Sequence, residues 1–491
     1  MSGTPDAVVV GAGPNGLAAA VTLARAGLSV RLYERESTIG GGARTEELTL
    51  PGFLHDVCSA IHPLGLSSGF FRRFELTKRM EFVVPEISYA QPLDTPASGG
   101  RAAIAWRDLE RTVAGLGVDG TAWRRLLGPL VARADDVAQF AGSPIIGVPR
   151  HPIAALLLGL RVLEQGTIDW NTRFREEAAP ALLTGAFAHP VQPMPSLSSA
   201  AGGLVLAATA HARGWPVPVG GSRSIVQAMA DDLLAHGGEI VTDTEITSIG
   251  QLPPATAAIF DVTPRALSHI VGDRLPHGYR RALERFRYGN GVAKVDFALS
   301  APVPWRDERL AEAATVHVGG TRAEMQRAEA DVAAGRLPGD PYVLVSQPTP
   351  FDPSRAPAGK HVLWAYTHVP RDSHEDRTEA VIRQIERFAP GFRDTILASA
   401  SRTSVDVAAH NPNYIGGDIA AGEVDMRQLI VRPTLSPTPW RTPAAGVYLT
   451  GASTAPGPGV HGLSGYYAAR TALGDVFGIT EMPYLGLDPR A

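Results

Sequence analysis

AVVVGAGPNGLAAAVTLARAGLSVRLYE, residues 7–34, is the stretch that decides the fold. The β-branched run at 7–10 is typical of a buried parallel strand. The alanine-rich segment at 17–26 predicts a helix, and residues 28–33 predict a second strand. A strand, a GxGxxG turn, a helix and a second strand form a βαβ unit of about 30 residues, which is the unit that binds dinucleotides.

The three glycines of this turn have separate roles. Gly11 permits the tight turn, Gly13 lets the backbone approach a pyrophosphate, and Gly16 allows the helix to pack closely on the strand. The helix amino terminus then presents free N–H groups and a positive dipole end to the diphosphate. An acid at the end of the second strand is placed to accept hydrogen bonds from both ribose hydroxyls. The predicted dinucleotide site comprises Gly11, Gly13, Pro14, Asn15, Gly16 and Glu34. The alternative is a glycine-rich turn without a ligand.

The composition bounds the class of protein. At about 150 residues per domain, a chain of 491 residues predicts two or three domains. Apolar residues make up 44% and charged residues 19%, so the chain can bury a sizeable core. A net charge of −4 gives no electrostatic reason to expect nucleic acid. The single cysteine, Cys58, excludes an internal disulfide, and no spacing of His or Cys indicates a metal site.

A second glycine-rich loop, RESTIGGGART, follows the predicted ribose acid directly and carries Arg35, Gly41, Gly42 and Arg44. It resembles the GG doublet of flavoproteins in the amine oxidase and phytoene desaturase superfamily. The resemblance implies that the dinucleotide is FAD, with this loop along its diphosphate and flavin. Arg44 suits that place because a guanidinium forms charge-assisted, bidentate hydrogen bonds to anions. The alternative for Arg44 is a surface salt bridge.

A third glycine-rich loop lies between a predicted strand at 447–450 and a helix that begins near Gly462. It resembles the flavin motif of phytoene desaturase-like proteins, in which a helix amino terminus stabilises negative charge on the flavin ring. Ala452 stands where many related flavoproteins have an acid for the ribityl chain, so this contact is expected from backbone or from Ser453. That departure favours the carotenoid desaturase branch. The resemblance implies cofactor contacts from Gly451, Ala452, Ser453, Val460, His461 and Gly462.

A middle segment resembles the stretch where such chains re-enter the FAD domain. Residues 225–234 predict a helix, and residues 239–241 and 245–249 predict strands. The resemblance implies that backbone near Ile246 meets the adenine. A plain crossover from helix to strand is the alternative.

The lysine candidate comes from the same resemblance. Residues 53–63, 291–297 and 411–418 look like the bacterial and mitochondrial phytoene desaturase-like subgroup. In amine oxidases a lysine in a strand of similar sequence holds a water against flavin N5. Lys294, one of only three lysines, falls at that position. Such a lysine can orient the water and favour negative charge near N5. The alternative is an ion pair with an acid such as Asp296.

Two histidines are weaker candidates for catalysis. His62 and His461 lie in segments that border the flavin by this resemblance, and histidine can act as a base near neutral pH. The alternative for each is a hydrogen-bonded residue in the wall of the site.

The expected architecture is an α/β fold with a Rossmann-like FAD-binding domain and an interleaved α+β substrate domain. The FAD-binding domain is expected to comprise residues 1–85, 215–290 and 425–491, and the substrate-binding domain residues 86–214 and 291–424. Predicted helices at 322–334 and 379–388 and predicted strands at 342–345 and 362–366 belong to the latter. A mixed sheet backed by helices is expected to roof the flavin.

The resemblance implies an FAD-dependent desaturase or dehydrogenase that acts on a lipophilic substrate, with isoprenoids as one class. The alternatives are an amine oxidase that releases imine and hydrogen peroxide, a non-enzymatic escort protein for prenylated partners, and a plain NAD(P) dehydrogenase.

A cytoplasmic location is expected, because no stretch has the pattern of a signal peptide or membrane span. The apolar run at 153–163, flanked by Arg150 and Arg161, is either a buried helix or one that lies on a membrane surface. The sequence leaves the oligomeric state open.

Overall fold

The computed structural model describes residues 3–487, and its first layer is a five-stranded parallel sheet in the order β16-β10-β1-β2-β9. The strands are β1 (Ala7–Val10), β2 (Val30–Tyr33), β9 (Glu239–Val241), β10 (Ala257–Asp261) and β16 (Val447–Thr450). The central strand β1 places Ala7 opposite Val30 of β2 and Ala257 of β10. The predicted βαβ unit is therefore confirmed.

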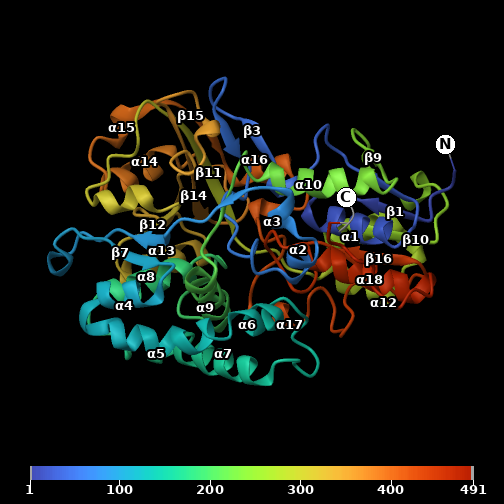
Figure 1. Ribbon diagram of the computed structural model, residues 1–491, viewed down its shortest axis with the longest axis horizontal. Coiled ribbons are helices and arrows are strands. Elements are labelled where there is room, and N and C mark those ends of the chain that lie inside the picture. The colour runs from blue at the N-terminus through green and yellow to red at the C-terminus, as the bar shows by residue number, and fades with distance from the viewer. Residues whose placement is uncertain (1–2, 488–491) are drawn as a thin grey trace.

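Helices cover both faces of this sheet (Figure 1). They are α1 (Pro14–Arg25), α10 (Arg223–Ala235) and α18 (Leu463–Val476) on one face, and α11 (Pro264–Val271) and α12 (His277–Glu284) on the other. Val9 packs against the first group and Val8 belongs to the core with the second, as the alternation of a strand requires. The expected Rossmann-like α/β arrangement is confirmed.

The second layer is a seven-stranded mixed sheet in the order β15-β11-β14-β13-β12-β6-β7. Its strands are β6 (Ile87–Gln91), β7 (Ala103–Trp106), β11 (Gly291–Leu299), β12 (Thr315–Val318), β13 (Val343–Ser346), β14 (His361–Val369) and β15 (Ile396–Arg402). All neighbours are antiparallel except β12 and β6. α14 (Thr378–Glu386) and α15 (Phe392–Thr395) pack on one apolar face through Ile382, Ile385 and Phe392.

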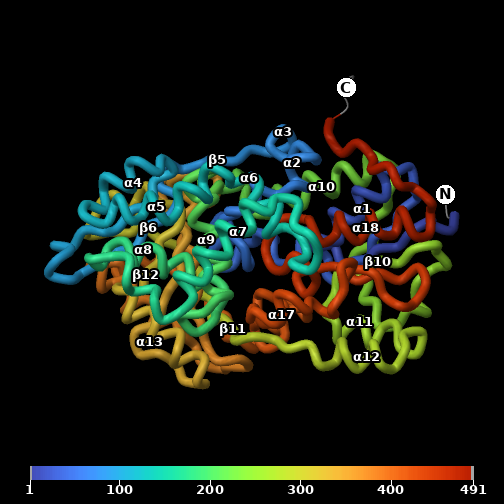
Figure 2. The backbone as a smooth tube through the Cα atoms, turned by 90° about the horizontal axis from the view of Figure 1, so that it is seen from below, coloured from blue at the N-terminus to red at the C-terminus, as the bar shows by residue number. Residues whose placement is uncertain are grey.

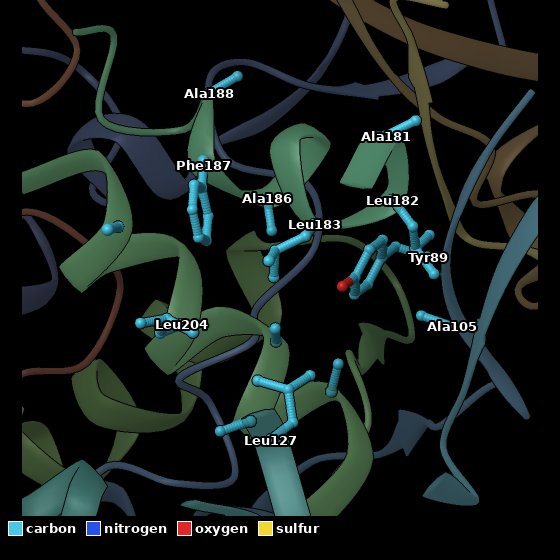
Figure 3. Close-up of a cluster of buried hydrophobic side chains, with 14 of the residues drawn as sticks. Tyr89, Ala105, Leu127, Ala181, Leu182, Leu183, Ala186, Phe187, Ala188 and Leu204 are labelled. Atoms are coloured by element: carbon cyan, nitrogen blue, oxygen red, sulfur yellow. The ribbon is translucent and has the colours of Figure 1, made fainter. Parts of the chain in front are cut away.

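A layer of helices packs against the opposite face of this sheet. These helices are α4 (Leu109–Gly115), α5 (Gly120–Val131), α6 (Ala134–Ala141), α7 (Pro152–Gln165), α8 (Ala178–Phe187) and α9 (Leu197–Ala212). Figure 3 shows their core at the sheet, where Tyr89 of β6 lies beside Leu182 and Ala105. Gly203 of α9 allows this packing because a Cβ there would lie 2.1 Å from the ring of Phe187.

The chain passes between the two sheets more than once, and these crossings are hydrogen-bonded together. β5 (Phe82–Val83) pairs with β8 (Val217–Pro218) at one crossing. At another, Asp418 accepts a hydrogen bond from the backbone N–H of Gly289. Figures 1 and 2 show the five-stranded sheet near both chain ends and the seven-stranded sheet at the far end of the long axis. The domain boundaries given above stay a prediction.

Seven further helices and strands complete the named elements, and all but α13 are at most seven residues long. They are β3 (Thr45–Glu47), β4 (Leu54–Asp56), α2 (Gly69–Arg73), α3 (Leu76–Arg79), α13 (Arg322–Ala333), α16 (Ser404–His410) and α17 (Met426–Ile430). The predicted strand at 245–249 is wrong, because the chain leaves β9 irregularly and ends in a 3-10 turn, Ile249–Gln251. Asp243 has a positive φ of 52°, which turns the backbone out of the extended path, and Ser248 caps the 3-10 turn instead of continuing a strand.

Candidate active site

A cavity of about 510 Å³ extends between the two sheets. Its first end is lined by all three glycine-rich loops: Gly13, Pro14, Asn15, Gly41, Gly42, Gly451, Ala452, Ser453 and Val460. Its other end is lined by residues of the seven-stranded sheet and the helical layer: Leu158, His189, Val205, Leu206, Trp215, Thr315, Leu344, Trp364 and Tyr366. Segments far apart in the sequence thus line one cavity of the size that small-molecule sites occupy.

The loop at 11–16 has the geometry that a diphosphate requires. Gly13 is the residue before α1 and makes no side-chain cap, so the helix amino terminus faces the cavity with backbone alone. Gly16 must be glycine, because a Cβ there would lie 1.9 Å from the carbonyl oxygen of Gly11. The Oδ1 of Asn15 is buried, faces this cavity and has no partner among residues 3–487. These features fit a bound dinucleotide.

Glu34 stands at the carboxyl end of β2, where the ribose acid is predicted. Its Oε2 accepts a hydrogen bond from the N–H of Ala12 at 2.8 Å, and its Oε1 accepts one from the N–H of Glu36 at 3.0 Å. The carboxylate is therefore held against the glycine turn.

The second loop packs directly on the first. A Cβ on Gly42 would lie 2.0 Å from Oη of Tyr414, so a larger residue there would displace Tyr414. Arg44 is buried, donates from Nε to the carbonyl of Gly41 and places Nη2 2.8 Å from Nε2 of His410. The surface salt bridge considered for Arg44 is therefore not its main contact, although Arg44 does not line the cavity. Arg35 is paired with Glu36 at the surface, outside the cavity.

The third loop reaches the cavity from β16. Ser453 donates its hydroxyl to the carbonyl of Ala421 at 2.6 Å, and Arg432 donates from Nε to the carbonyl of Ala452 at 3.0 Å. Gly462 caps α18 with a positive φ of 65°. His461 is held at both ring nitrogens: Nδ1 accepts from the N–H of Leu463, and Nε2 lies 3.1 Å from the carbonyl of Gly457. His461 is thus hydrogen-bonded within its loop and does not line the cavity, and its catalytic role stays a prediction.

Ile246 does not line the cavity. It is buried with Val10 and Tyr33 in the core that α11 also joins. Its contact with an adenine stays a prediction.

Lys294 lies on β11 and is fully enclosed. Its Nζ is paired with Asp296, the alternative that the sequence left open, and burial lowers the pKa of Lys294 while Asp296 opposes the shift. Lys294 also lines a small pocket of about 20 Å³, which has space for one water molecule. That pocket shares five lining residues with the large cavity: Cys58, Trp364, Tyr366, Tyr414 and Ile419. The ion pair and a water-holding role are thus compatible, and the latter stays a prediction.

His62 does line the large cavity. Its Nε2 lies 2.8 Å from Oγ of Ser222, and burial lowers the pKa of His62 to about 4. The ring is therefore neutral near pH 7, which is the protonation state of a base, but Ser222 holds one nitrogen.

The main site residue that sequence reasoning missed is Asp261, at the carboxyl end of β10. Its Oδ2 accepts a hydrogen bond from the N–H of Gly16 at 2.8 Å, and it lines the cavity. Burial raises the pKa of Asp261 to about 7, and the charge of Glu34 adds to the rise. An acid that ends an apolar run at 257–261 was the available signal, but only the sheet order shows that it meets the first glycine turn.

A glycine cradle at the carboxyl edge of a parallel sheet, opening into an apolar cavity beneath a second sheet, is the arrangement of a dinucleotide-dependent oxidoreductase. Two family models match the chain: an NAD(P)-binding Rossmann-like domain at residues 9–74 and flavin containing amine oxidoreductase at residues 158–473. The chain belongs to the flavin containing amine oxidoreductase family.

Named relatives agree with this family. Pyridine nucleotide-disulfide oxidoreductase domain-containing protein 2 of Rattus norvegicus is 25% identical over 96% of this chain and 94% of its own. Phytoene dehydrogenase of Streptomyces griseus is 25% identical over 80% of this chain and 78% of its own. A solved putrescine oxidase variant with redesigned cofactor binding shares the fold, with a TM-score of 0.60 and 16% identity over 96% of this chain and 99% of its own.

The protein is an FAD-dependent oxidoreductase. The predicted cofactor, the phytoene desaturase-like resemblance and the assignment as an enzyme are confirmed. The escort-protein and plain NAD(P) dehydrogenase alternatives are therefore set aside. The individual contacts to FAD, which the three glycine-rich loops are expected to make, stay predictions.

Proposed function

We propose that the protein is a desaturase or dehydrogenase that takes a hydride from an uncharged, lipophilic substrate, of which isoprenoids are one class. The observation that carries this proposal is the lining of the large cavity. Among the described residues that line it, Asp261 is the only carboxylate, and there is no lysine or arginine. A charged substrate would leave its charge without a partner in that volume, whereas an apolar chain is matched by the lining.

The chain's own residues supply binding and orientation. Bound FAD would supply the two-electron acceptor for the hydride. Trp215, Leu344 and Trp364 present apolar surface to the substrate. Asn15 and the backbone of the first two glycine loops hold the diphosphate end of the cofactor.

The test is anaerobic reduction of the purified holoenzyme by a panel of polyenes, saturated isoprenoids and primary amines. The expected result is bleaching of the flavin absorbance by an isoprenoid, with a product that has lost two hydrogens. Amine oxidation is the second candidate, favoured by Lys294 beside a small pocket. Bleaching by amines alone, with imine and hydrogen peroxide as products in air, would establish that candidate and overturn the desaturase proposal.

Replacing Lys294 with methionine tests the role of this buried cation. We expect oxygen to reoxidise the photoreduced enzyme about 10²-fold more slowly, because a cation that stabilises developing negative charge is lost. Stopped-flow absorbance of the flavin measures this without knowledge of the substrate. Lys360→Met, which removes a lysine away from the cavity, is the control. Equal rates in the two variants would show that Lys294 serves only its ion pair with Asp296.

We also propose that α7 and the loop before it rest on a lipid bilayer. Ile153, Leu156, Leu160 and Leu163 are each more than half exposed and lie on one face of α7, while Leu158 on the other face lines the cavity. Val148, before the helix, is 95% exposed.

An apolar face this large with arginine at its flank, Arg150, is typical of a helix in a membrane interface. A lipophilic substrate would then be close to the cavity wall. No helix within residues 3–487 is long and apolar enough to cross a membrane.

The double variant Leu156→Ser with Leu160→Ser is expected to lose about 10²-fold in partition to vesicles of phosphatidylcholine and phosphatidylglycerol, because two leucines no longer enter the lipid. Co-sedimentation measures the partition. Leu234→Ser, an exposed leucine on α10, is the matched control. If the wild-type protein does not sediment with vesicles, or if it is a dimer that the double variant dissociates, the face is not a lipid-binding surface.

A further inference from the structure

The two faces of the seven-stranded sheet differ in chemistry. One face carries Val295, Val316, Val345 and Ala365, which are packed in the apolar core under α14. The alternate residues of the same strands point the opposite way, and four of them, Thr315, Leu344, Trp364 and Tyr366, line the large cavity. This second face is the one that a substrate would touch.

The pairing of the strands places the residues of this second face in two rows that cross the sheet. The first row is Lys294 on β11, Tyr366 on β14, Leu344 on β13 and His317 on β12. The second row is Asp296, Trp364, Ser346 and Thr315 on the same four strands. Since neighbouring strands lie about 4.8 Å apart, each row spans about 14 Å from β11 to β12.

The second row contains buried polar atoms that the described residues leave without hydrogen-bond partners. They are Oδ1 of Asp296, Nε1 of Trp364, Oγ of Ser346 and Oγ1 of Thr315. Buried polar groups are nearly always bonded, so several such atoms in one row need an explanation. Trp364 and Thr315 line the cavity, which makes a bound molecule the natural partner.

The β12 end of these rows has a second polar group in the cavity, His189. Its Nε2 lies 3.1 Å from Nε2 of His317, and its ring meets the ring of Trp215 edge-on at 5.7 Å. Burial lowers the pKa of His189 to about 3 and holds the pKa of His317 well below its usual range. Both rings are therefore neutral, and this end of the cavity can offer hydrogen bonds but no positive charge.

We propose that Thr315 and His189 bind an uncharged oxygen, a hydroxyl or a carbonyl, at one end of the substrate. The apolar remainder then extends along Leu344, Trp364 and Tyr366 toward the glycine-rich loops. A carboxylate is excluded from this end because no lysine or arginine among the described residues lines the cavity. The inference rests on the proposed function and narrows its substrate class to a lipophilic alcohol, aldehyde or ketone.

Binding of matched ligands to the holoenzyme tests the inference without turnover. The probes are farnesol and the hydrocarbon farnesene, titrated by isothermal calorimetry or by the fluorescence of the cavity tryptophans. We expect the wild-type protein to bind farnesol about tenfold more tightly, because its hydroxyl pairs with buried groups that the hydrocarbon leaves unpaired. Thr315→Val, which keeps the shape of the side chain, is expected to remove the preference.

A control variant and a second cavity variant accompany Thr315→Val. Thr367→Val alters a threonine on the other face of β14, where Oγ1 donates to the carbonyl of Tyr342, and is expected to keep the preference for farnesol. His189→Phe keeps an aromatic ring without its nitrogens and is expected to weaken the preference even if Thr315→Val folds poorly. Equal affinity of the wild-type protein for both probes, or a preference that survives both cavity variants, overturns the inference and leaves the proposed function standing. Failure to bind either probe also overturns the inference, and flavin reduction by the substrate panel then decides the proposed function separately.

Discussion

Asp261→Asn is expected to remove the pH dependence of FAD affinity. In the wild-type protein the carboxyl group of Asp261 touches the first glycine turn, with Oδ2 bonded to Gly16 and a pKa raised to about 7 by burial. A diphosphate at that turn repels the ionised form, so FAD binding favours the protonated form. The dissociation constant should therefore rise by up to about tenfold per pH unit above neutrality, and asparagine, which cannot ionise, should give a flat profile.

Fluorescence titration of the apoprotein with FAD between about pH 6 and about pH 9 measures this effect. The stability of the apoprotein gives an independent reading. A folded pKa of about 7 against an ordinary value of 3.8 means that the folded state holds a proton that the unfolded state has released. Stability is therefore lost as pH rises through this interval, and Asp261→Asn should abolish that loss. Asp273→Asn alters an exposed acid and should leave both profiles unchanged. A wild-type FAD affinity that does not vary with pH would show that Asp261 lies away from the diphosphate.

Arg355→Met is expected to destabilise the fold by about 3–5 kcal/mol, because it leaves a buried carboxylate without its cation. Arg355 and Asp56 are 0% and 1% exposed, and Nη2 lies 2.8 Å from Oδ2. Asp56 also accepts hydrogen bonds from Oγ1 of Thr45 and from the N–H of Ser222, which contacts His62. We therefore expect a lower temperature of thermal unfolding together with weaker retention of FAD.

Thermal unfolding and FAD content, compared between variants, measure the effect. Arg336→Met breaks an exposed pair with Asp331 and should cost less than about 1 kcal/mol. Combining Arg355→Met with Asp56→Asn should recover part of the stability, since the unpaired charge is removed. If Arg355→Met unfolds at the same temperature as Arg336→Met, the buried pair of Arg355 and Asp56 does not stabilise the fold.

Much of the cofactor end could be predicted because local sequence decides it. Gly16 and Gly42 occupy positions where a Cβ would lie too close to backbone or to Tyr414, so these glycines mark the loops in the sequence itself.

Some elements outside the cofactor end could also be predicted. The predicted helices at 322–334 and 379–388 are found as α13 and α14, since their apolar spacing already matches one buried face. The predicted strand at 245–249 is wrong because an unusual backbone angle at Asp243 overrides its β-branched residues.

The substrate end could not be predicted in the same way. Thr315 and His189 are isolated in the sequence, and neither belongs to a motif. Both line one cavity because β12 lies beside β13 and because the turn after α8 places His189 against His317 of β12. The exposure of Leu156 and Leu160 likewise depends on which face of α7 the helical layer leaves uncovered.

The sequence by itself determined the βαβ unit, the three glycine-rich loops and the FAD chemistry that they imply, because these depend on contacts between residues near one another or on the absence of a side chain. The tertiary structure alone decided that Asp261 meets Gly16 across 245 residues, that Lys294 pairs with Asp296 beside a small pocket, and that Thr315 and Trp364, with polar atoms that the described residues leave unpaired, line one cavity. Those arrangements arise from strand order and register, which bring distant residues together and set the charge and hydrogen bonding that a substrate meets.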